Sequence, residues 1–161
     1  MPVPFVRSWL DNVRRNHALE HATVSVLMAR HGPQRMAGRA SGDGFFFLGD
    51  VSSEELMDSA REALSRLQRG EASLAVSPLC GTNIAMAGLL AAGAATMSLS
   101  RGRGRFGNAF SAAMLGVVLS QPLGRLVQKY LTTLADLEGV EIVDTRTVLG
   151  GLRKVHTRSS R

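Results

Sequence analysis

Cysteine and large aromatic side chains are scarce in this 161-residue sequence. Aromatic residues make up only 5% of the chain, and Cys80 is its one cysteine, so an intrachain disulfide is excluded. The segment after Met1 lacks the basic-then-apolar layout of a secretory signal, because Trp9, Asp11 and Arg14 interrupt it. A reducing, cytoplasm-facing location is the simplest interpretation.

Charge is absent from two long stretches in the second half of the chain. Residues 72–100 contain no charged side chain over 29 positions, and residues 106–124 contain none over 19. Since the hydrocarbon core of a bilayer requires about 20 apolar residues in a helix, we predict two membrane-spanning helices, Thr82–Ser100 and Gly107–Leu126. The alternative is a buried helical hairpin in a soluble dimer, because Ala and Gly are only marginally apolar.

Small residues recur along both predicted spans and form seams that let two helix backbones approach closely. We therefore predict a homo-oligomer assembled through these seams. Pro122 is expected to kink or end the second span, because it removes a helix hydrogen bond. The seam residues are Gly81, Ala85, Gly88, Ala92 and Ala95 in the first span, and Ala109, Ala112, Gly116, Ser120 and Gly124 in the second.

The chain is basic, with a formal net charge of +6, which favours anionic partners. Basic residues gather in the turn between the spans, at Arg101, Arg103 and Arg105, and in a tail at residues 151–161 that we expect to be disordered. Neither group is interleaved with aromatic side chains, so no specific nucleic acid is predicted and the lipid bilayer is the expected partner. Two spans return the chain to its starting side, so both termini lie on one side of the membrane. We predict a cell-membrane location with both termini cytoplasmic, because the inferred reducing location favours that side.

The segments that flank the uncharged stretches predict an α+β fold. Residues 6–31 have the apolar spacing of an amphipathic helix, which Gly32 and Pro33 end. Ser52-Ser-Glu-Glu55 is a capping box that starts a second helix, and Gly70 stops it. Four short strands are expected around these helices, at residues 36–40, 45–51, 72–77 and 140–143.

These elements predict a small helix, strand-hairpin, helix and strand domain that is interrupted by a two-helix transmembrane hairpin. We expect the α+β domain to comprise residues 1–78 together with 137–150. The membrane hairpin then occupies residues 79–133, and the basic tail occupies 151–161. The hairpin is thus an insertion in the chain of the small domain.

The sharpest chemical pattern is His17-Ala-Leu-Glu20-His21 in the first predicted helix. Two histidines four residues apart project in the same direction and can share one metal ion, and Glu20 lies at the edge of the same stripe. This is the H-x-x-E-H arrangement of inverted zincins, in which the glutamate activates a metal-bound water. If the protein is an enzyme, the pattern predicts a zinc-dependent hydrolase with Glu20 as its catalytic residue. The alternative is a structural polar cluster that contains no metal.

A zinc site of this kind requires a third protein ligand, and no spacing identifies it. Cys80 is the attractive choice because zinc accepts a thiolate readily, while Asp50 and Glu54 are the other options. Cys80 also opens the first span, where the side chain of Thr82 or Asn83 is expected to cap the helix. Alternatively, the Cys80 sulfur lies at this helix N-terminus and faces the histidines, a position that favours its thiolate.

Five short runs carry a family resemblance. They are Asn16-His-Ala-Leu-Glu-His-Ala22, Phe47-Leu-Gly-Asp-Val51, Cys80-Gly-Thr-Asn83, Gln121-Pro-Leu-Gly124 and Thr132-Thr133. Together, over about residues 15–142, they resemble an uncharacterised bacterial family of small membrane proteins known only as a domain of unknown function. The resemblance implies membrane association and no established activity. In that family a His-Pro pair often precedes the Cys-Gly-Thr-Asn run, whereas this chain has Ser77-Pro78, which removes a third histidine ligand.

Two functional hypotheses remain open at this point. The first is an integral membrane protein that binds a metal ion, zinc in the first instance, through His17, His21 and Cys80. The second is a non-enzymatic membrane scaffold that oligomerises through the small-residue seams and uses the histidines and Glu20 as a structural cluster.

Overall fold

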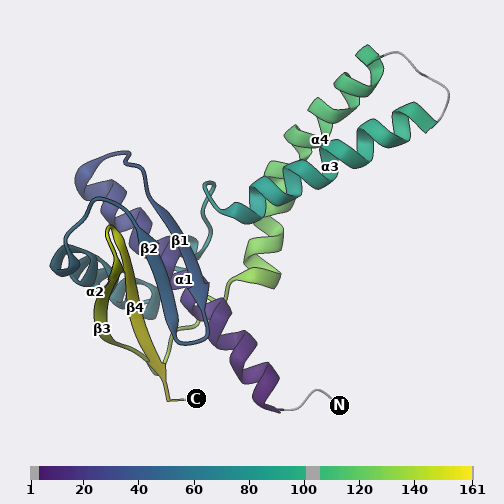
Figure 1. Ribbon diagram of the computed structural model, residues 1–161. Helices are drawn as coiled ribbons and strands as arrows, with labels where there is room; N and C mark the ends of the chain where they lie inside the picture. Colours follow the sequence, from purple (N-terminus) through teal and green to yellow (C-terminus); the bar gives the residue numbers. More distant parts are fainter. Residues whose placement is uncertain (1–3, 101–105, 161) are drawn as a thin grey trace. The chain divides into compact units, whose positions relative to one another are not determined.

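The chain forms two compact units in the computed structural model, which describes residues 4–100 and 106–160 (Figure 1). The first, the sheet unit, contains the chain up to Val76 and again from Lys129 onward, and the second, the hairpin unit, is Ser77–Gln128. The predicted turn arginines Arg101, Arg103 and Arg105 lie outside the described residues. Their contact with lipid therefore stays a prediction.

Two helices form one layer of the sheet unit. Helix α1, Pro4–His31, ends as predicted before Gly32, whose φ of 76° few other residues adopt. Helix α2, Ser53–Gln68, begins after Ser52, and the Ser52 hydroxyl accepts the Glu55 amide at 3.1 Å. The predicted capping box is therefore confirmed, and the apolar stripe of α2 is buried against α1.

Four antiparallel strands form the other layer, in the order β1-β2-β4-β3. The predicted hairpin consists of β1, Ala37–Ser41, and β2, Gly44–Leu48. A second hairpin consists of β3, Val140–Leu149, and β4, Leu152–Ser159, and the pairing of β2 with β4 joins the two hairpins. Helices α1 and α2 cover one face of this sheet (Figure 1). The predicted α+β class is confirmed.

One apolar core holds the two layers together. Phe45 and Phe47 alternate along β2 and are fully buried, as is Val155 on β4. They belong to the same buried cluster as Leu19 of α1 and Leu56 of α2. Each such side chain stabilises the fold by about 1.5–3 kcal/mol relative to an exposed position, so this cluster fixes α1 on the sheet.

Two of the sequence predictions for this unit are wrong. The tail expected to be disordered contains strand β4, because Val155 reaches the core and the strand pairs with β2 on one side and β3 on the other. The strand expected at residues 72–77 is a short 3₁₀ helix, η1, Ala72–Ala75. Its carbonyl groups bond locally and to α1, so this segment adds no strand to the sheet.

The hairpin unit consists of two long helices that pack on each other. Helix α3 is Gly81–Ser100 and helix α4 is Phe106–Val127, close to the predicted limits. A Cβ atom added at Gly116 would lie 2.7 Å from the backbone carbonyl of Leu90, so the α4 seam serves the close approach of α3. Pro122 lies inside α4 and does not end it.

Candidate metal site

His17 and His21 lie one turn apart on α1, with their imidazole rings in contact. The ring centroids are 4.4 Å apart and the ring planes are inclined at 60°. His21 is buried and His17 is partly buried. The two histidines therefore project to the same side of α1, as their spacing predicts.

Each imidazole is fixed by a backbone carbonyl at the end of a helical turn, where carbonyl groups lack a partner within the turn. His17 Nδ1 donates to the carbonyl oxygen of Thr132 at 2.9 Å, at the end of η2, the π-helical turn Gln128–Thr132 that follows α4. His21 Nδ1 donates to the carbonyl oxygen of Ala75 at 2.8 Å. Because a carbonyl oxygen only accepts, each Nδ1 carries a proton, and in the neutral imidazole Nε2 then carries the lone pair. This is the tautomer in which Nε2 binds a metal ion while the carbonyl orients the ring.

In the hairpin unit, the buried Cys80 caps the start of α3. Its Sγ accepts the Thr82 amide at 3.4 Å, and its carbonyl oxygen accepts the Asn83 amide at 2.9 Å. The prediction that a Thr82 or Asn83 side chain caps this helix is wrong, because the cysteine sulfur itself reaches the amide two positions on. A helix N-terminus attracts negative charge and so favours the thiolate form, which binds metals.

Two buried amide side chains, Asn83 and Gln128, fix the loop that carries Cys80. Gln128 Oε1 accepts the Ser77 amide at 2.9 Å, and Gln128 Nε2 donates to Asn83 Oδ1 at 2.9 Å. Asn83 Nδ2 donates in turn to the carbonyl oxygens of Ser77 at 3.2 Å and Pro78 at 2.9 Å. These bonds tie the loop before α3 to the residue that follows α4. Sequence reasoning missed Gln128, because a glutamine at the end of an apolar helix carries no signal of its partners.

Glu20 lies against the sheet. It is buried, and its carboxylate lies so close to Gly38 of β1 that any Cβ atom there would overlap it. Asn16, one turn earlier on α1, occupies the same side and accepts the Thr157 hydroxyl at 2.7 Å. Glu20 therefore contributes to the packing of α1 against β1. Its catalytic role stays a prediction.

Two imidazoles and one thiol make up a donor group that could hold a metal ion. The group is His17, His21 and Cys80, and each residue offers one ligand atom. Within residues 4–100 and 106–160, no other group of three or more His, Cys, Asp and Glu side chains meets this description. The other predicted options for the third ligand, Asp50 and Glu54, are exposed residues next to the start of α2 and outside this group.

Two helices are long and apolar enough to cross a membrane. They are Gly81–Ser100, of 20 residues, and Phe106–Thr132, of 27 residues, in which α4 continues into η2. Only 6% and 17% of their most apolar windows are buried, whereas the core helix of a soluble protein is mostly buried. Length and composition therefore permit the predicted crossing.

The comparisons with known proteins fit the sequence patterns. A model of a domain of unknown function, DUF6391, matches residues 12–145. The chain belongs to this family. An uncharacterized protein of the cyanobacterium Picosynechococcus sp. strain PCC 7002 is 34% identical over 144 residues, which cover 81% of this chain and 70% of the relative. No solved structure matches the chain. The DUF6391 match confirms the predicted resemblance to a domain of unknown function, and the matched residues include His17, His21 and Cys80.

Proposed function

We propose that this chain is a membrane-anchored protein that binds a transition metal ion through His17, His21 and Cys80. The observation that carries the proposal is the pair of contacting imidazoles on α1, each with its Nδ1 on a backbone carbonyl. Two rings fixed in this tautomer offer two Nε2 lone pairs on one side of a helix, which is the arrangement that one ion can share.

Chain length supports Cys80 as the third ligand. His21 holds the Ala75 carbonyl, and Cys80 follows Ala75 by only five residues. Since an extended chain covers at most about 3.5 Å per residue, Cys80 is tethered within about 17 Å of this hydrogen bond. The bond from the Cys80 amide to the Ser77 carbonyl, at 3.3 Å, bends this segment and shortens its reach further.

Zinc is the ion that this donor group suits best. Zinc accepts imidazole nitrogen and thiolate sulfur together, and sites with three protein ligands keep a fourth position for water or another ligand. We assign Glu20 a supporting role beside the histidines and not a place among the ligands, because its carboxylate is packed against Gly38.

Metal content tests the proposal. The full chain, purified in detergent without a histidine tag, is expected to carry about one equivalent of zinc, measured by mass spectrometry of the metal. The double substitution His17→Ala/His21→Ala and the single substitution Cys80→Ser are each expected to reduce this content strongly. Cobalt substitution adds a second readout, because a thiolate-to-cobalt absorption band should appear in the parent chain and disappear in Cys80→Ser.

Two variants serve as matched controls. His156→Ala removes a histidine of β4 that lies near Asp43 and outside the donor group, and Glu20→Gln preserves the shape of the buried carboxylate. Both are expected to keep the metal. Equal metal content in the parent chain and in the double histidine variant would reject metal binding at these residues.

Membrane anchoring is supported by the length, composition and exposure of α3 and of the helix Phe106–Thr132. The expressed chain is expected to stay in the membrane pellet after an alkaline carbonate wash and to require detergent for release. Release by a salt wash alone, as a monodisperse soluble protein, would contradict the anchoring.

A non-enzymatic scaffold that forms a homo-oligomer is the second proposed function, and the glycines of α3 favour it. A Cβ atom built at Gly88 meets no heavy atom within 4 Å among the described residues outside its own helix backbone, and the same holds at Gly81, two seam positions earlier. Gly116, in contrast, already faces the α3 backbone. The open Gly81–Gly88 side is therefore the seam that we propose for a second copy.

A matched pair of variants tests this seam. Gly88→Leu is expected to reduce the oligomer to a smaller species in detergent while the helical content is unchanged, because the substitution adds bulk only to the open side. Gly116→Leu is expected to destabilise the hairpin itself, because its side chain would meet the backbone of Leu90. An oligomer of unchanged mass in Gly88→Leu, measured by light scattering, would reject assembly through this side.

A further inference from the structure

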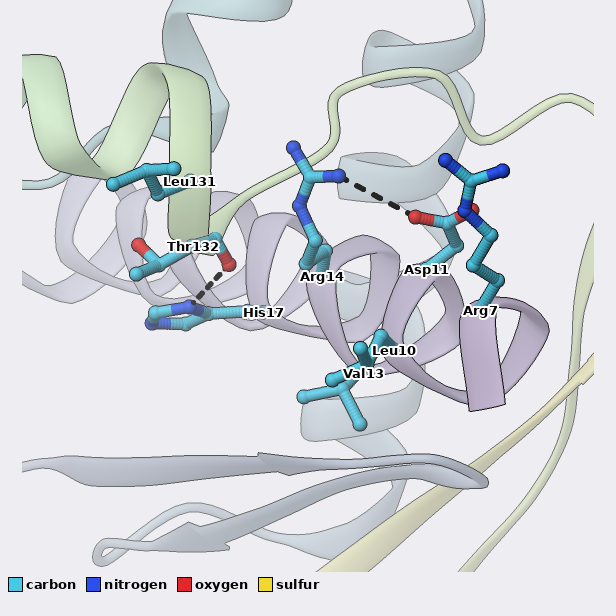
Figure 2. Close-up of a pocket in the computed structure, with 8 residues that line it drawn as sticks. All are labelled: Arg7, Leu10, Asp11, Val13, Arg14, His17, Leu131 and Thr132. Atoms are coloured by element: carbon cyan, nitrogen blue, oxygen red, sulfur yellow. Dashed lines mark hydrogen bonds and ion pairs between the residues drawn. The ribbon is translucent and has the colours of Figure 1, made fainter. Parts of the chain in front are cut away.

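A pocket of about 730 Å³ opens beside His17 in the sheet unit, between α1 and the end of η2 (Figure 2). Arg7, Asp11 and Arg14 of α1 line its polar side together with Thr132. Of the residues that line this pocket, the metal-binding proposal uses only His17. The pocket's charged side chains raise the question of what it binds.

Arg14 holds one wall of the pocket and keeps one donor unused. Its Nη1 donates to Asp11 Oδ1 at 3.3 Å, and its Nη2 donates to the carbonyl oxygens of Tyr130 at 3.1 Å and Thr133 at 3.4 Å. Its Nε atom is buried and has no hydrogen-bond partner in the part of the chain that the structure describes. A buried donor without a partner costs stability unless a ligand or water satisfies it.

Thr132 and Arg7 add two further polar groups to the same pocket. The Thr132 hydroxyl is buried and, within the described residues, also lacks a hydrogen-bond partner. Arg7 is exposed and forms no hydrogen bond or ion pair with any described residue. The unused donors of the pocket are thus the Arg7 guanidinium, the Arg14 Nε atom and the Thr132 hydroxyl. Among the described lining residues, the only carboxylate is that of Asp11, which is paired with Arg14.

Apolar side chains also line the pocket. Leu10, Val13 and Leu131 line it, and Leu131 and Thr132 are the last residues of the membrane-length helix Phe106–Thr132. A ligand that fills the pocket therefore has an anionic head and an apolar part. Guanidinium and hydroxyl donors suit a phosphate group, whose oxygens accept several hydrogen bonds at once.

We propose that this pocket binds a phosphate group, and that the source of this phosphate is the headgroup of an anionic phospholipid. Arg7, the Arg14 Nε atom and the Thr132 hydroxyl donate to the phosphate oxygens, and the three apolar side chains contact the glycerol and the first acyl carbons. His17 contributes only a wall, because its Nδ1 is bound to the Thr132 carbonyl. The site functions without a metal ion and is independent of the metal-binding proposal.

Binding of defined probes to the full chain, purified in a phosphate-free non-ionic detergent with a chelator present, tests the proposal by titration calorimetry. The probes are dihexanoyl phosphatidylglycerol, glycerol 3-phosphate, and a glycolipid of the same chain length without phosphate. Arg7→Gln and Thr132→Val remove one pocket donor each and leave the hydrogen bonds of Arg14 in place. Arg39→Gln, on the exposed β1 strand, is the matched control for general loss of positive charge.

The lipid probe is expected to bind the parent chain, with affinity about tenfold lower in Arg7→Gln and several-fold lower in Thr132→Val. Arg39→Gln should bind as the parent does. Binding of glycerol 3-phosphate with the same dependence on the variants would support the phosphate site and identify a soluble phosphate as a sufficient ligand. Equal binding of the phosphate-free glycolipid, an equal loss in Arg39→Gln, or binding that neither pocket variant alters would overturn the proposal.

Discussion

The buried amide pair in the hairpin unit leads to a sharp prediction about the only cysteine. Gln128→Leu keeps the size of the side chain but leaves the Ser77 amide and the Asn83 Oδ1 atom without the hydrogen bonds that Gln128 supplies. Each buried group that loses its partner costs about 1–3 kcal/mol. We assume a cost of about 1.5 kcal/mol for each of the two groups. The substitution should therefore lower the free energy required to open the loop around Cys80 by about 3 kcal/mol.

Maleimide labelling of the Cys80 thiol measures this opening directly. Cys80 is buried and is the sole cysteine, so the labelling rate reports the fraction of molecules in which this loop is open. A change of about 3 kcal/mol corresponds to a rate increase of roughly two orders of magnitude. The measurement is made on the full chain in detergent with a chelator present, so that bound metal does not protect the thiol.

The matched control is Gln121→Leu, which makes the same chemical change at an exposed position of α4, two turns before Gln128. It should label at the parent rate. A double-mutant cycle with Asn83→Leu adds a second check, because the two substitutions remove one shared hydrogen bond and should cost less together than their sum. A labelling rate for Gln128→Leu within about threefold of the parent rate, or an equal rise in Gln121→Leu, would refute the assigned hydrogen bonds.

Two further predictions concern the stability of the sheet unit. Unfolding can be followed by the fluorescence of Trp9, the single tryptophan, because its indole ring lies at the β1–β2 turn. Ser52→Ala should lower the free energy of unfolding by about 1 kcal/mol through loss of the α2 cap, and Ser52→Asp should restore it; an unchanged thermal midpoint in Ser52→Ala would contradict the cap. The hydrogen bond from Lys154 lowers the pKa of Asp43 from its ordinary value of 3.8, so its stabilisation is present above that value and is lost as the pH falls through the lowered pKa. Asp43→Asn should thus lower the free energy of unfolding by at most about 1 kcal/mol near neutral pH, since the ion pair is largely exposed. The difference in unfolding free energy between the variant and the parent should disappear at acidic pH. A difference that stays constant at every pH would exclude the ion pair.

The elements that the sequence predicts well are those whose signals are local. The capping box at Ser52, the stop at Gly32 and the spacing of apolar residues along α1 each act within a few positions, and the structure places the helix limits accordingly. The uncharged stretches likewise predict α3 and α4 to within a few residues. The spacing of His17 and His21 predicts their contact for the same reason, because one helical turn determines it.

Elements that depend on distant partners could not be predicted in this way. Strand β4 carries one fully buried apolar residue, Val155, among basic and polar neighbours, and it becomes a central strand because β2 and β3 pair with its two edges. The segment Ala72–Ala75 has strand-like alternation but forms η1 and offers its last carbonyl to His21. The cap formed by the Cys80 sulfur and the buried partners of Gln128 are contacts of the same kind, which no periodicity encodes.

The hydrogen bonds of the two histidines relate the candidate metal site to the insertion of the hairpin in the chain. His21 is hydrogen-bonded to the carbonyl of Ala75, just before the chain leaves the sheet unit. His17 is hydrogen-bonded to the carbonyl of Thr132, just after the chain returns to it. Arg14 adds to the second attachment, since its side chain donates to the Thr133 carbonyl and its own carbonyl accepts the Leu134 amide at 3.1 Å. Both ends of the inserted segment are therefore fastened to neighbouring turns of α1. Because each imidazole is bound to one of these two ends, a metal ion shared by the two rings would stabilise both attachments at once.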